Sequence, residues 1–251
     1  MYMKSIIKFL LPLKVRQQIK KVQYLVFGLD KEYKGMNSTE VFDKIYSDSI
    51  WGIDDNGFSS SGGGSHRDIL VNPYIESVSK FLKINSFNTI VDLGCGDFNI
   101  GKSFVKLCKK YVACDISKII IDRNQNKYNF KNLEFKIVNV SINELPKGDI
   151  AFVRQVLQHL SNDEIKKFVD KLNKDKPYQF LLVTEQLPFK ENFKANLDKN
   201  TGANIRLSID SGVELHKKPF DLNFKSFKNL CEIKTTFLGK DSIIRSTLYE
   251  I

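Results

Sequence analysis

The feature that most constrains this chain is a short glycine-containing loop between an apolar strand and a helix. The loop covers residues 92–97, with the sequence DLGCGD, after a strand predicted over residues 89–93 and before a helix predicted over residues 101–109. Gly94 and Gly96 lack the Cβ atoms that would keep a ligand away from the backbone. Ligands of an open parallel sheet bind beyond the carboxyl ends of its strands, so this loop predicts a binding site.

Apolar strand-like runs alternate with amphipathic helical runs from residue 70 onward. Strands are predicted at residues 89–93, 111–114, 133–138, 150–153 and 180–184, and helices at 75–82, 101–109, 119–127 and 161–172. This β-α-β-α order predicts an α/β fold with a parallel sheet and helices on both faces. The last helix begins with a capping box from Ser161 to Glu164.

The chain of 251 residues suits one α/β domain with an N-terminal extension. We predict a basic arm over residues 1–36 and the α/β domain over residues 37–251, opening with a helix at 38–50. Two β-rich runs, 231–238 and 242–249, predict a terminal antiparallel hairpin.

Charge and cysteine content bear on the setting of the protein. The formal net charge is +10, and residues 1–29 carry six basic side chains and no acid. A solvated basic surface, weak peripheral contact with an anionic membrane, and nucleic-acid binding remain open. Nucleic acid is the least favoured partner, because the basic residues are not clustered with stacking aromatics.

No apolar run approaches the roughly 18–20 residues of a membrane span, and no signal-peptide cleavage site follows the early apolar run. The four cysteines form no CxxC pair and no metal-type spacing. We therefore expect reduced thiols in a cytoplasmic protein, with the basic arm providing any contact with a membrane surface.

An acid follows the glycine loop at the distance expected for an adenosine-type ligand. Asp115 ends the second predicted strand about twenty residues past the glycines, where a carboxylate accepts hydrogen bonds from ribose hydroxyls. Gly94, Gly96 and Gly101 give GxGxxxxG, which differs from the spacing of the NAD fingerprint. The sequence also lacks the GxxxxGK[ST] loop of nucleotide triphosphatases.

The segment 91–100 resembles motif I of class I S-adenosylmethionine-dependent methyltransferases, with Phe98 where the family often has a third glycine. The resemblance implies a Rossmann-like, seven-stranded sheet and S-adenosylmethionine as the cofactor. It also implies adenine contacts from Asn139, where the family usually has Asp, and from Val140. The cofactor-binding residues expected in this way are Asp92, Gly94, Gly96, Asp97, Asp115, Ile116, Asn139, Val140 and Gln155.

A closer resemblance extends over most of residues 40–221. Its landmarks are the segments 45–46, 51–52, 61–65, 95–99, 154–161, 205–206, 213–215 and 219–220. These segments resemble methyltransferases of bacterial capsule and surface-glycan gene clusters, which include enzymes of capsular O-methyl phosphoramidate formation. The resemblance implies a small-molecule or glycan-precursor acceptor with a phosphoramidate group or a sugar hydroxyl.

Three residues at the strand ends are candidates for catalysis. His159 lies just before the helix cap, and imidazole titrates near neutral pH, so it is the candidate general base or else a packed structural histidine. Arg154 ends the fourth strand, where it binds an anionic acceptor or forms an ion pair with Asp92, Asp97 or Glu185. Glu185 ends the fifth strand and faces the substrate or braces Arg154.

A Gly/Ser-rich segment over residues 51–66 contains the only tryptophan of the chain. We expect it to fold over a ligand, and a flexible linker is the alternative. The expected substrate-binding residues, including two from the later segment 201–221, are Trp51, Gly63, Ser65, His66, Arg206 and Glu214. Asp210, Glu214 and His216 also suggest a metal site, but such residues are common in polar loops and no metal is expected.

Two other functions fit parts of the pattern. An RNA methyltransferase agrees with the basic charge, but the chain lacks an RNA-binding module and the Asn-Pro-Pro-Tyr tetrapeptide of amino-group modifiers. A non-catalytic scaffold is also compatible with the fold, since a fold does not prove activity. The retained Gly94, Gly96 and Asp115 favour a working cofactor site.

Overall fold

The computed structural model describes Val15 and residues 29–251. The predicted basic arm over residues 1–36 therefore lies mostly outside the described residues. Its last part is described and includes a short 3₁₀ helix, η1 (Lys31–Tyr33), which leads into the domain.

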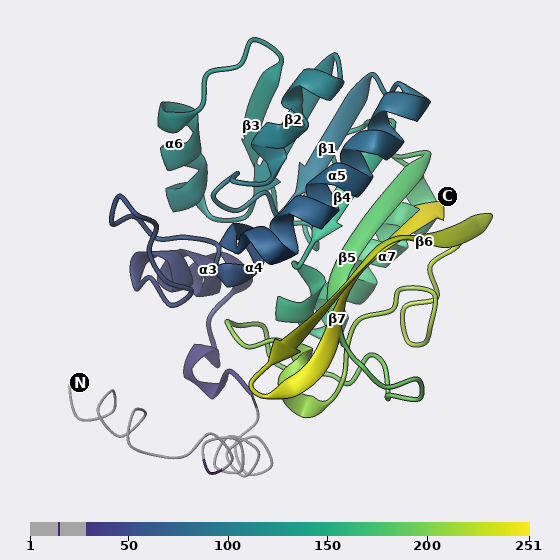
Figure 1. Ribbon diagram of the computed structural model, residues 1–251. Coiled ribbons are helices and arrows are strands. Elements are labelled where there is room, and N and C mark those ends of the chain that lie inside the picture. Colours follow the sequence, from purple (N-terminus) through teal and green to yellow (C-terminus); the bar gives the residue numbers. More distant parts are fainter. Residues whose placement is uncertain (1–14, 16–28) are drawn as a thin grey trace.

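The core is a seven-stranded sheet with the order β3-β2-β1-β4-β5-β7-β6 (Figure 1). The strands are β1 (Thr89–Leu93), β2 (Lys110–Asp115), β3 (Leu133–Ile137), β4 (Ile150–Arg154), β5 (Phe180–Pro188), β6 (Ser226–Phe237) and β7 (Lys240–Glu250). The first five strands pair in parallel, and β7 lies antiparallel between β5 and β6. The predicted α/β class and the terminal antiparallel hairpin are confirmed.

Strands β1, β4 and β5 are buried almost throughout, as expected for strands whose two faces are covered by helices. The strand order reverses between β1 and β4, from which the chain runs outward in opposite directions. Such a switch point opens a crevice at the carboxyl ends of these strands. The motif loop after β1 and the turn after β4 therefore meet at one edge of the sheet.

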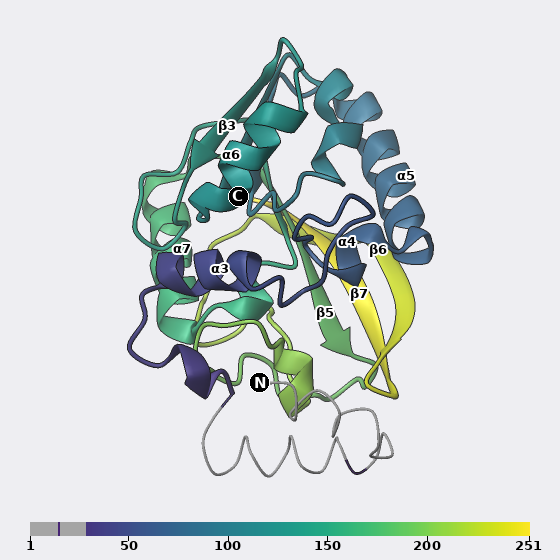
Figure 2. The same ribbon diagram turned by 90° about the vertical axis from the view of Figure 1, so that its left-hand side faces the viewer.

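Helices cover both faces, as Figure 2 shows with α5 on one side and α3, α6 and α7 on the other. Their bounds are α3 (Ser38–Ser47), α4 (Gly63–His66), α5 (Asp68–Asn85), α6 (Lys118–Lys127) and α7 (Asn162–Asp175). Helix α5 packs Tyr74 and Val78 into an apolar cluster with β1 and β4. Helix α7 packs Phe168 into the cluster on the opposite face.

The helix predicted over residues 101–109 is wrong. The segment forms two short 3₁₀ helices, η2 (Gly101–Ser103) and η3 (Val105–Leu107). The Asn132 side chain donates to the carbonyl oxygens of Val105 (2.8 Å) and Cys108 (3.0 Å), which satisfies these acceptors outside an α-helix. A local helical pattern does not include the distant Asn132, so it could not indicate this alternative.

The capping box of α7 is confirmed. Glu164 N donates to Ser161 Oγ at 3.4 Å, and Ser161 N donates to Glu164 Oε2 at 3.1 Å. Ser161→Ala is expected to lower the free energy of unfolding by about 1 kcal/mol, because α7 loses one of its N-terminal acceptors. Urea denaturation measures this change, with Ser161→Thr as the control that keeps a hydroxyl. Equal stability of the alanine variant would show that solvent replaces the cap.

Candidate functional site

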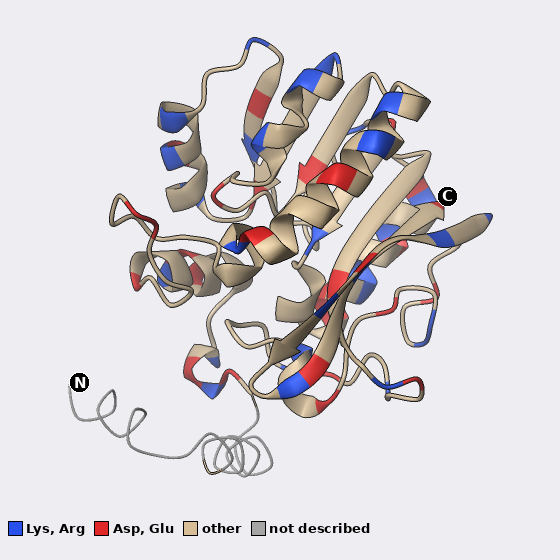
Figure 3. Cartoon of the chain, in the orientation of Figure 1, with Lys and Arg blue, Asp and Glu red and all other residues tan. Residues whose placement is uncertain are grey.

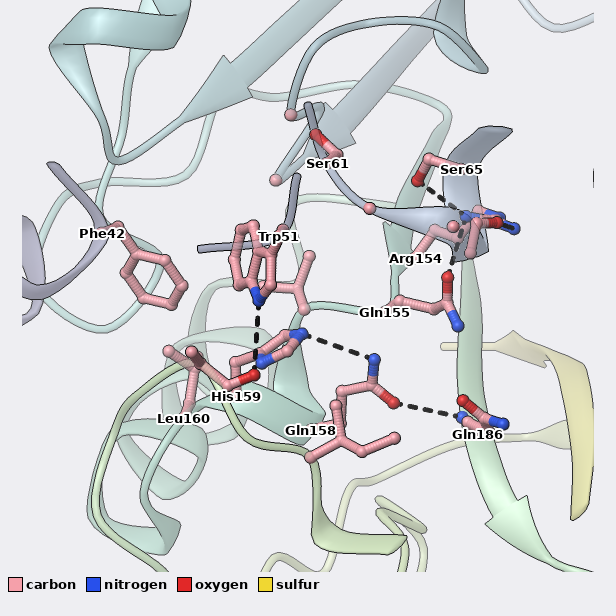
Figure 4. A pocket seen from close by; sticks show the side chains of 18 of the residues that line it. Phe42, Trp51, Ser61, Ser65, Arg154, Gln155, Gln158, His159, Leu160 and Gln186 are labelled. Atoms are coloured by element: carbon pink, nitrogen blue, oxygen red, sulfur yellow. Dashed lines mark hydrogen bonds between the residues drawn. The ribbon is translucent and has the colours of Figure 1, made fainter. Parts of the chain in front are cut away.

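A cavity of about 380 Å³ opens at the carboxyl ends of β1 and β4. Figure 4 shows its wall, with Trp51 and His159 close together and Arg154, Gln155 and Ser65 across from them. The sequence-predicted residues that line it are Trp51, Gly63, Ser65, Gly94, Gly96, Asp115, Ile116, Asn139, Val140, Arg154, Gln155 and His159. The site is thus built from segments far apart in the chain.

Two positions of the motif loop favour glycine through both backbone conformation and close packing. Gly94 has φ +83° and Gly96 has φ +54°, a left-handed conformation that favours glycine. A Cβ atom on Gly94 would lie 2.2 Å from a methyl group of Val156, and one on Gly96 would lie 2.2 Å from Ser61 Oγ. Close packing therefore adds to the backbone requirement at both positions.

Phe98 occupies the third-glycine position without entering the cavity. Its backbone takes the left-handed conformation at φ 61°, and its side chain is fully buried. The ring packs edge-on against Phe135 and Tyr128, with centroids at 5.1 and 5.2 Å. The departure from the family pattern thus leaves the cofactor side of the loop open.

Asp115 ends β2 against the motif loop. Its carboxylate accepts from Gly96 N and Ser117 N, both at 3.0 Å, and lines the cavity. Burial raises the pKa of Asp115 to about 6, while the backbone hydrogen bonds oppose this shift. The carboxylate can accept hydrogen bonds from a diol bound in the cavity.

Asp92 and Asp97 lie behind the motif loop and do not line the cavity. Asp92 accepts from the Tyr111 hydroxyl at 2.9 Å, and burial raises its pKa to about 7. Asp97 accepts from Ser61 N at 2.8 Å and lies 2.5 Å from His66 Nε2. Asp97 and His66 thus brace the loops around the cavity, and the expected contacts of Asp92 and Asp97 with the cofactor and of His66 with the substrate stay predictions.

The Gly/Ser-rich segment folds over the cavity and is not a flexible linker. Ser61 Oγ accepts from Asp97 N at 2.8 Å, which ties the segment to the motif loop. Arg154 Nη2 donates to Gly64 O at 2.7 Å. A Cβ atom on Gly64 would lie 2.3 Å from Gln155 Oε1, so glycine permits this close approach.

Trp51 forms part of the cavity wall. Its ring lies 4.9 Å from the ring of His159 and meets Tyr46 edge-on at 5.5 Å, measured between centroids. Its Nε1 donates to Ala203 O at 3.3 Å (Figure 4). The indole thus links the segment before the sheet to the loop around residue 203.

His159 lies in the 3₁₀ helix η4 (Leu157–His159), directly after β4. Burial, together with the nearby charge of Lys199, lowers the pKa of His159 to about 3, so the imidazole is neutral at physiological pH. Nδ1 lies 3.2 Å from Gly202 O, and we assign the proton to Nδ1 because a carbonyl only accepts. Nε2 is then an acceptor, 3.5 Å from Gln158 Nε2.

Arg154 crosses from β4 toward the Gly/Ser-rich segment. Nη1 donates to Gln155 Oε1 at 3.2 Å and to Ser65 Oγ at 3.4 Å, and the guanidinium lies 4.9 Å from the Tyr74 ring centroid. Its Nε is buried and has no hydrogen-bond partner within residues 29–251. Burial lowers the pKa of Arg154. Arg154 lines the cavity, where the charge of its guanidinium suits an anionic group of a ligand.

Glu185 does not line the cavity, and its expected catalytic role stays a prediction. Its carboxylate accepts from Leu157 N at 3.1 Å and Gln158 N at 3.0 Å. Burial raises the pKa of Glu185 to about 8. It therefore holds the η4 turn, and with it His159, in place.

Arg206 and Glu214 also do not line the cavity, and their expected substrate contacts stay predictions. Arg206 is fully buried in η5 (Arg206–Ile209) and donates to Leu157 O at 2.7 Å and Leu197 O at 3.0 Å. Glu214 forms an ion pair with Lys217 at 2.6 Å. Polar side chains in a covering segment were expected to face the ligand, whereas these two hold the segment together.

Several residues that line the cavity are not among the expected site residues. Gln158 and Gln186 lie along one wall, where Gln186 N donates to Gln158 Oε1 at 3.4 Å (Figure 4). Thr235 and Thr236 reach the cavity from the end of β6, and Asn204 from the loop before η5. The sequence indicates Gln158 and Gln186 only through their adjacency to His159 and Glu185. Thr235 and Thr236 reach the cavity only because the complete sheet brings the terminal hairpin next to it.

The suggested metal residues point to different partners. Asp210 pairs with Lys240, and His216 stacks on Phe227 at 4.9 Å between centroids. Within residues 29–251, no group of three or more His, Cys, Asp or Glu side chains is placed to hold a metal ion. No helix in this same part of the chain is long and apolar enough to cross a membrane.

Residues 91–174, about one third of the chain, match a family model described as a methyltransferase domain. No curated protein matches the chain. The matched segment includes the motif loop and His159.

Solved structures share the fold at low sequence identity. The N-methyltransferase NodS from Bradyrhizobium japonicum WM9, in complex with S-adenosylhomocysteine, has a TM-score of 0.55 and 11% identity, covering 83% of this chain and 99% of its own. Magnesium protoporphyrin IX methyltransferase from Synechocystis PCC 6803, with bound S-adenosylmethionine, has a TM-score of 0.52 and 15% identity, covering 86% and 98%. The N-terminal domain of EvdMO1, in the presence of S-adenosylhomocysteine and D-fucose, has a TM-score of 0.51 and 12% identity, covering 87% and 99%. The Rossmann-like methyltransferase fold therefore extends over the described domain.

Proposed function

We propose that this methyltransferase domain binds S-adenosylmethionine and methylates an oxygen of a capsule or surface-glycan precursor. The observation that carries the proposal is the two-sided cavity. Gly94, Gly96 and Asp115 line one side, and the uncharged imidazole of His159 lines the other, with Nε2 as an acceptor. A methyl donor and an acceptor can be held together in such a cavity.

The residues of the cofactor side fit S-adenosylmethionine. Asp115 would accept from the ribose hydroxyls, while Ile116, Asn139 and Val140 would surround the adenine. Arg154 lines the same cavity, and its guanidinium would bind either the carboxylate of the methionine part or an anionic acceptor. When bound, the cofactor supplies an electrophilic methyl group on a positively charged sulfur.

The acceptor side fits a molecule with several hydroxyl groups. Its polar lining consists of amides and hydroxyls, from Gln158, Gln186, Thr235 and Thr236, beside the aromatic ring of Trp51. Amides and hydroxyls both donate and accept, which matches sugar hydroxyls, and an aromatic ring packs against the apolar face of a sugar. The D-fucose in the EvdMO1 structure is a further reason to favour a sugar acceptor.

His159 would act as the base for a sugar hydroxyl. Its Nδ1 is occupied by Gly202 O, so Nε2 is the nitrogen that would take the proton. A phosphoramidate oxygen is the second candidate acceptor, because Arg67 and Arg154 both line the cavity. An anionic oxygen needs cationic partners and orientation but no base, so the role of His159 distinguishes the two acceptors.

The distribution of charge favours a small acceptor over RNA. Figure 3 shows Lys and Arg spread along α5, α6 and the loops of the described chain, with Asp and Glu among them. A phosphate backbone is usually met by a basic stripe and gives steep salt dependence. We also propose a cytoplasmic location, with any peripheral membrane contact made by the basic arm.

Isothermal titration with S-adenosylmethionine and S-adenosylhomocysteine tests the cofactor. Dissociation constants in the micromolar range are expected for both, with NAD as the control that does not bind. At a ligand concentration of 100 times the dissociation constant, the folded state gains about 2.7 kcal/mol, which thermal unfolding detects. A folded sample that binds neither compound would favour the scaffold interpretation.

Incubation with S-adenosylmethionine and candidate acceptors then tests the substrate class. Sugar nucleotides and phosphoramidates are compared by release of S-adenosylhomocysteine and by the mass of the methylated product. Methylation of a sugar hydroxyl is the expected result. Methylation of only the phosphoramidates would favour the second acceptor, and methylation of only RNA would refute the proposed acceptor class.

A further inference from the structure

A buried ion pair joins the segment before the domain to the loop that covers the cavity. Asp30 Oδ2 lies 3.0 Å from Lys199 Nζ, and both side chains are 0% exposed. Asp30 falls inside the predicted basic arm, but the structure places it within the folded domain. Neither residue lines the cavity itself.

The pair holds the loop over residues 199–204 through several hydrogen bonds. Lys199 Nζ donates to the carbonyl oxygens of His159 at 3.1 Å and Asn200 at 2.7 Å. Asp30 Oδ1 accepts from the Asn204 backbone N at 3.0 Å and from Asn204 Nδ2 at 2.7 Å. The first and last residues of the loop are thus both attached to this pair.

The middle of the loop contacts the two rings of the acceptor side. Gly202 O accepts from His159 Nδ1 at 3.2 Å, Gly202 N donates to His159 O at 2.9 Å, and Ala203 O accepts from Trp51 Nε1 at 3.3 Å. A Cβ atom on Gly202 would lie 2.4 Å from Asp30 Cγ, so the loop packs directly on the carboxylate. A shift of the loop would therefore move both His159 and Trp51.

Stability alone is a weak reason for such a pair. Removing two charges from water costs free energy that their attraction often fails to recover, and apolar replacements are often neutral. The pair has a second consequence, since the Lys199 charge adds to burial in lowering the pKa of His159. The geometry of the ion pair constrains His159 and Trp51, the two side chains that face the acceptor.

We propose that Asp30 and Lys199 are positioning residues. Their ion pair holds loop 199–204 in place, so that Nε2 of His159 and the ring of Trp51 both point toward the acceptor. The proposal rests on the proposed function of His159. It assigns no contact with cofactor or acceptor to either residue. It also makes the segment around Asp30 a required part of the catalytic domain.

The fluorescence of Trp51 tests this assignment in the full-length chain, because Trp51 is the only tryptophan. Asp30→Asn, Lys199→Met and the double variant are compared with the unchanged protein. We expect emission at longer wavelength and stronger quenching by acrylamide, because the indole loses its fixed partner at Ala203. Two-dimensional ¹H–¹⁵N spectra of the imidazoles should show His159 losing its single Nδ1–H tautomer.

Two further variants separate positioning from general destabilisation. Gly202→Ala keeps both charges but displaces the loop from Asp30, and should give the same changes in a milder form. Asp149→Asn is the matched control, because Asp149 accepts from Asn88 N and Thr89 N at the amino end of β1. It should lower stability without changing Trp51 emission.

A folded double variant and a folded Gly202→Ala variant with unchanged Trp51 emission and an unchanged His159 tautomer would overturn the proposal. Binding of S-adenosylhomocysteine is expected to persist in these variants, since Gly94 and Asp115 are untouched. Failure of the unchanged protein to bind the cofactor would refute the proposed function instead. The Trp51 and His159 signals would still decide whether the ion pair positions them.

Discussion

Replacing His159 by alanine is expected to lower turnover by about 10²–10⁴-fold and to leave the affinity for S-adenosylhomocysteine unchanged. His159 contacts Trp51, Gln158 and the loop at Gly202, all of which belong to the acceptor side. The cofactor side is formed by other residues, Gly94 and Asp115 among them. A loss confined to turnover is therefore the signature of a base.

The lowered pKa of His159 is compatible with this role. A hydroxyl that has received a methyl group becomes an oxonium ion, which is a far stronger acid than an imidazolium with a pKa of about 3. Nε2 can thus take the proton once the new carbon–oxygen bond has formed. Because imidazole protonates only near its lowered pKa, the rate should show no inflection from His159 between about pH 5 and pH 8.

His159→Asn and His216→Ala are the comparison variants. The asparagine side chain keeps a donor near Gly202 O but lacks the basic nitrogen, so the turnover of the His159→Asn variant should remain low. His216 stacks on Phe227 away from the cavity, and its replacement should leave turnover intact. Full activity of His159→Ala would eliminate the histidine as the base and favour an anionic acceptor.

Replacing Asp115 by alanine is expected to weaken binding of S-adenosylhomocysteine by about 1–3 kcal/mol, or roughly 5- to 150-fold in the dissociation constant. In the proposed complex the carboxylate accepts from the ribose, and in the structure it accepts from Gly96 N and Ser117 N. Its loss leaves the ribose hydroxyls without their acceptor and releases the motif loop. Isothermal titration measures the change.

The ionisation of Asp115 sets the pH dependence of this binding. Burial raises its pKa to about 6 in the free protein, so an increasing share of the carboxyl is protonated as the pH falls through that value. Affinity should therefore decline toward acid pH in the unchanged protein and remain flatter in Asp115→Ala. Asp163→Ala, at the exposed Asp163–Lys167 pair of α7, is the control. Unchanged affinity in Asp115→Ala would remove the ribose assignment.

Local patterns in the sequence were sufficient for the frame of the site. Alternating apolar runs predicted the parallel strands, and parallel strands bring their carboxyl ends to one edge. The strand ends therefore predict that Asp115 and Arg154 lie at one edge of the sheet, and the resemblance to class I methyltransferases adds Asn139. The cap at Ser161 was equally predictable, because a capping box is complete within four residues.

Contacts between distant segments decided the rest. Glu185 and Arg206 resemble ligand-binding residues in the sequence, but burial among backbone amides and carbonyls makes them supports of the η4 turn. The direction of the Phe98 ring depends on partners from β2 and β3 that its own neighbourhood does not reveal.

The sequence by itself determined where the strands of the sheet form and where their ends meet, because strand periodicity and the conformational freedom of glycine are local properties. Only the tertiary structure decided which polar side chains face the cavity and which lie buried behind it. Asp30 is the clearest example, since its partner Lys199 lies far along the chain. Burial and electrostatic environment arise from the packing of all the elements, so no local pattern encodes them.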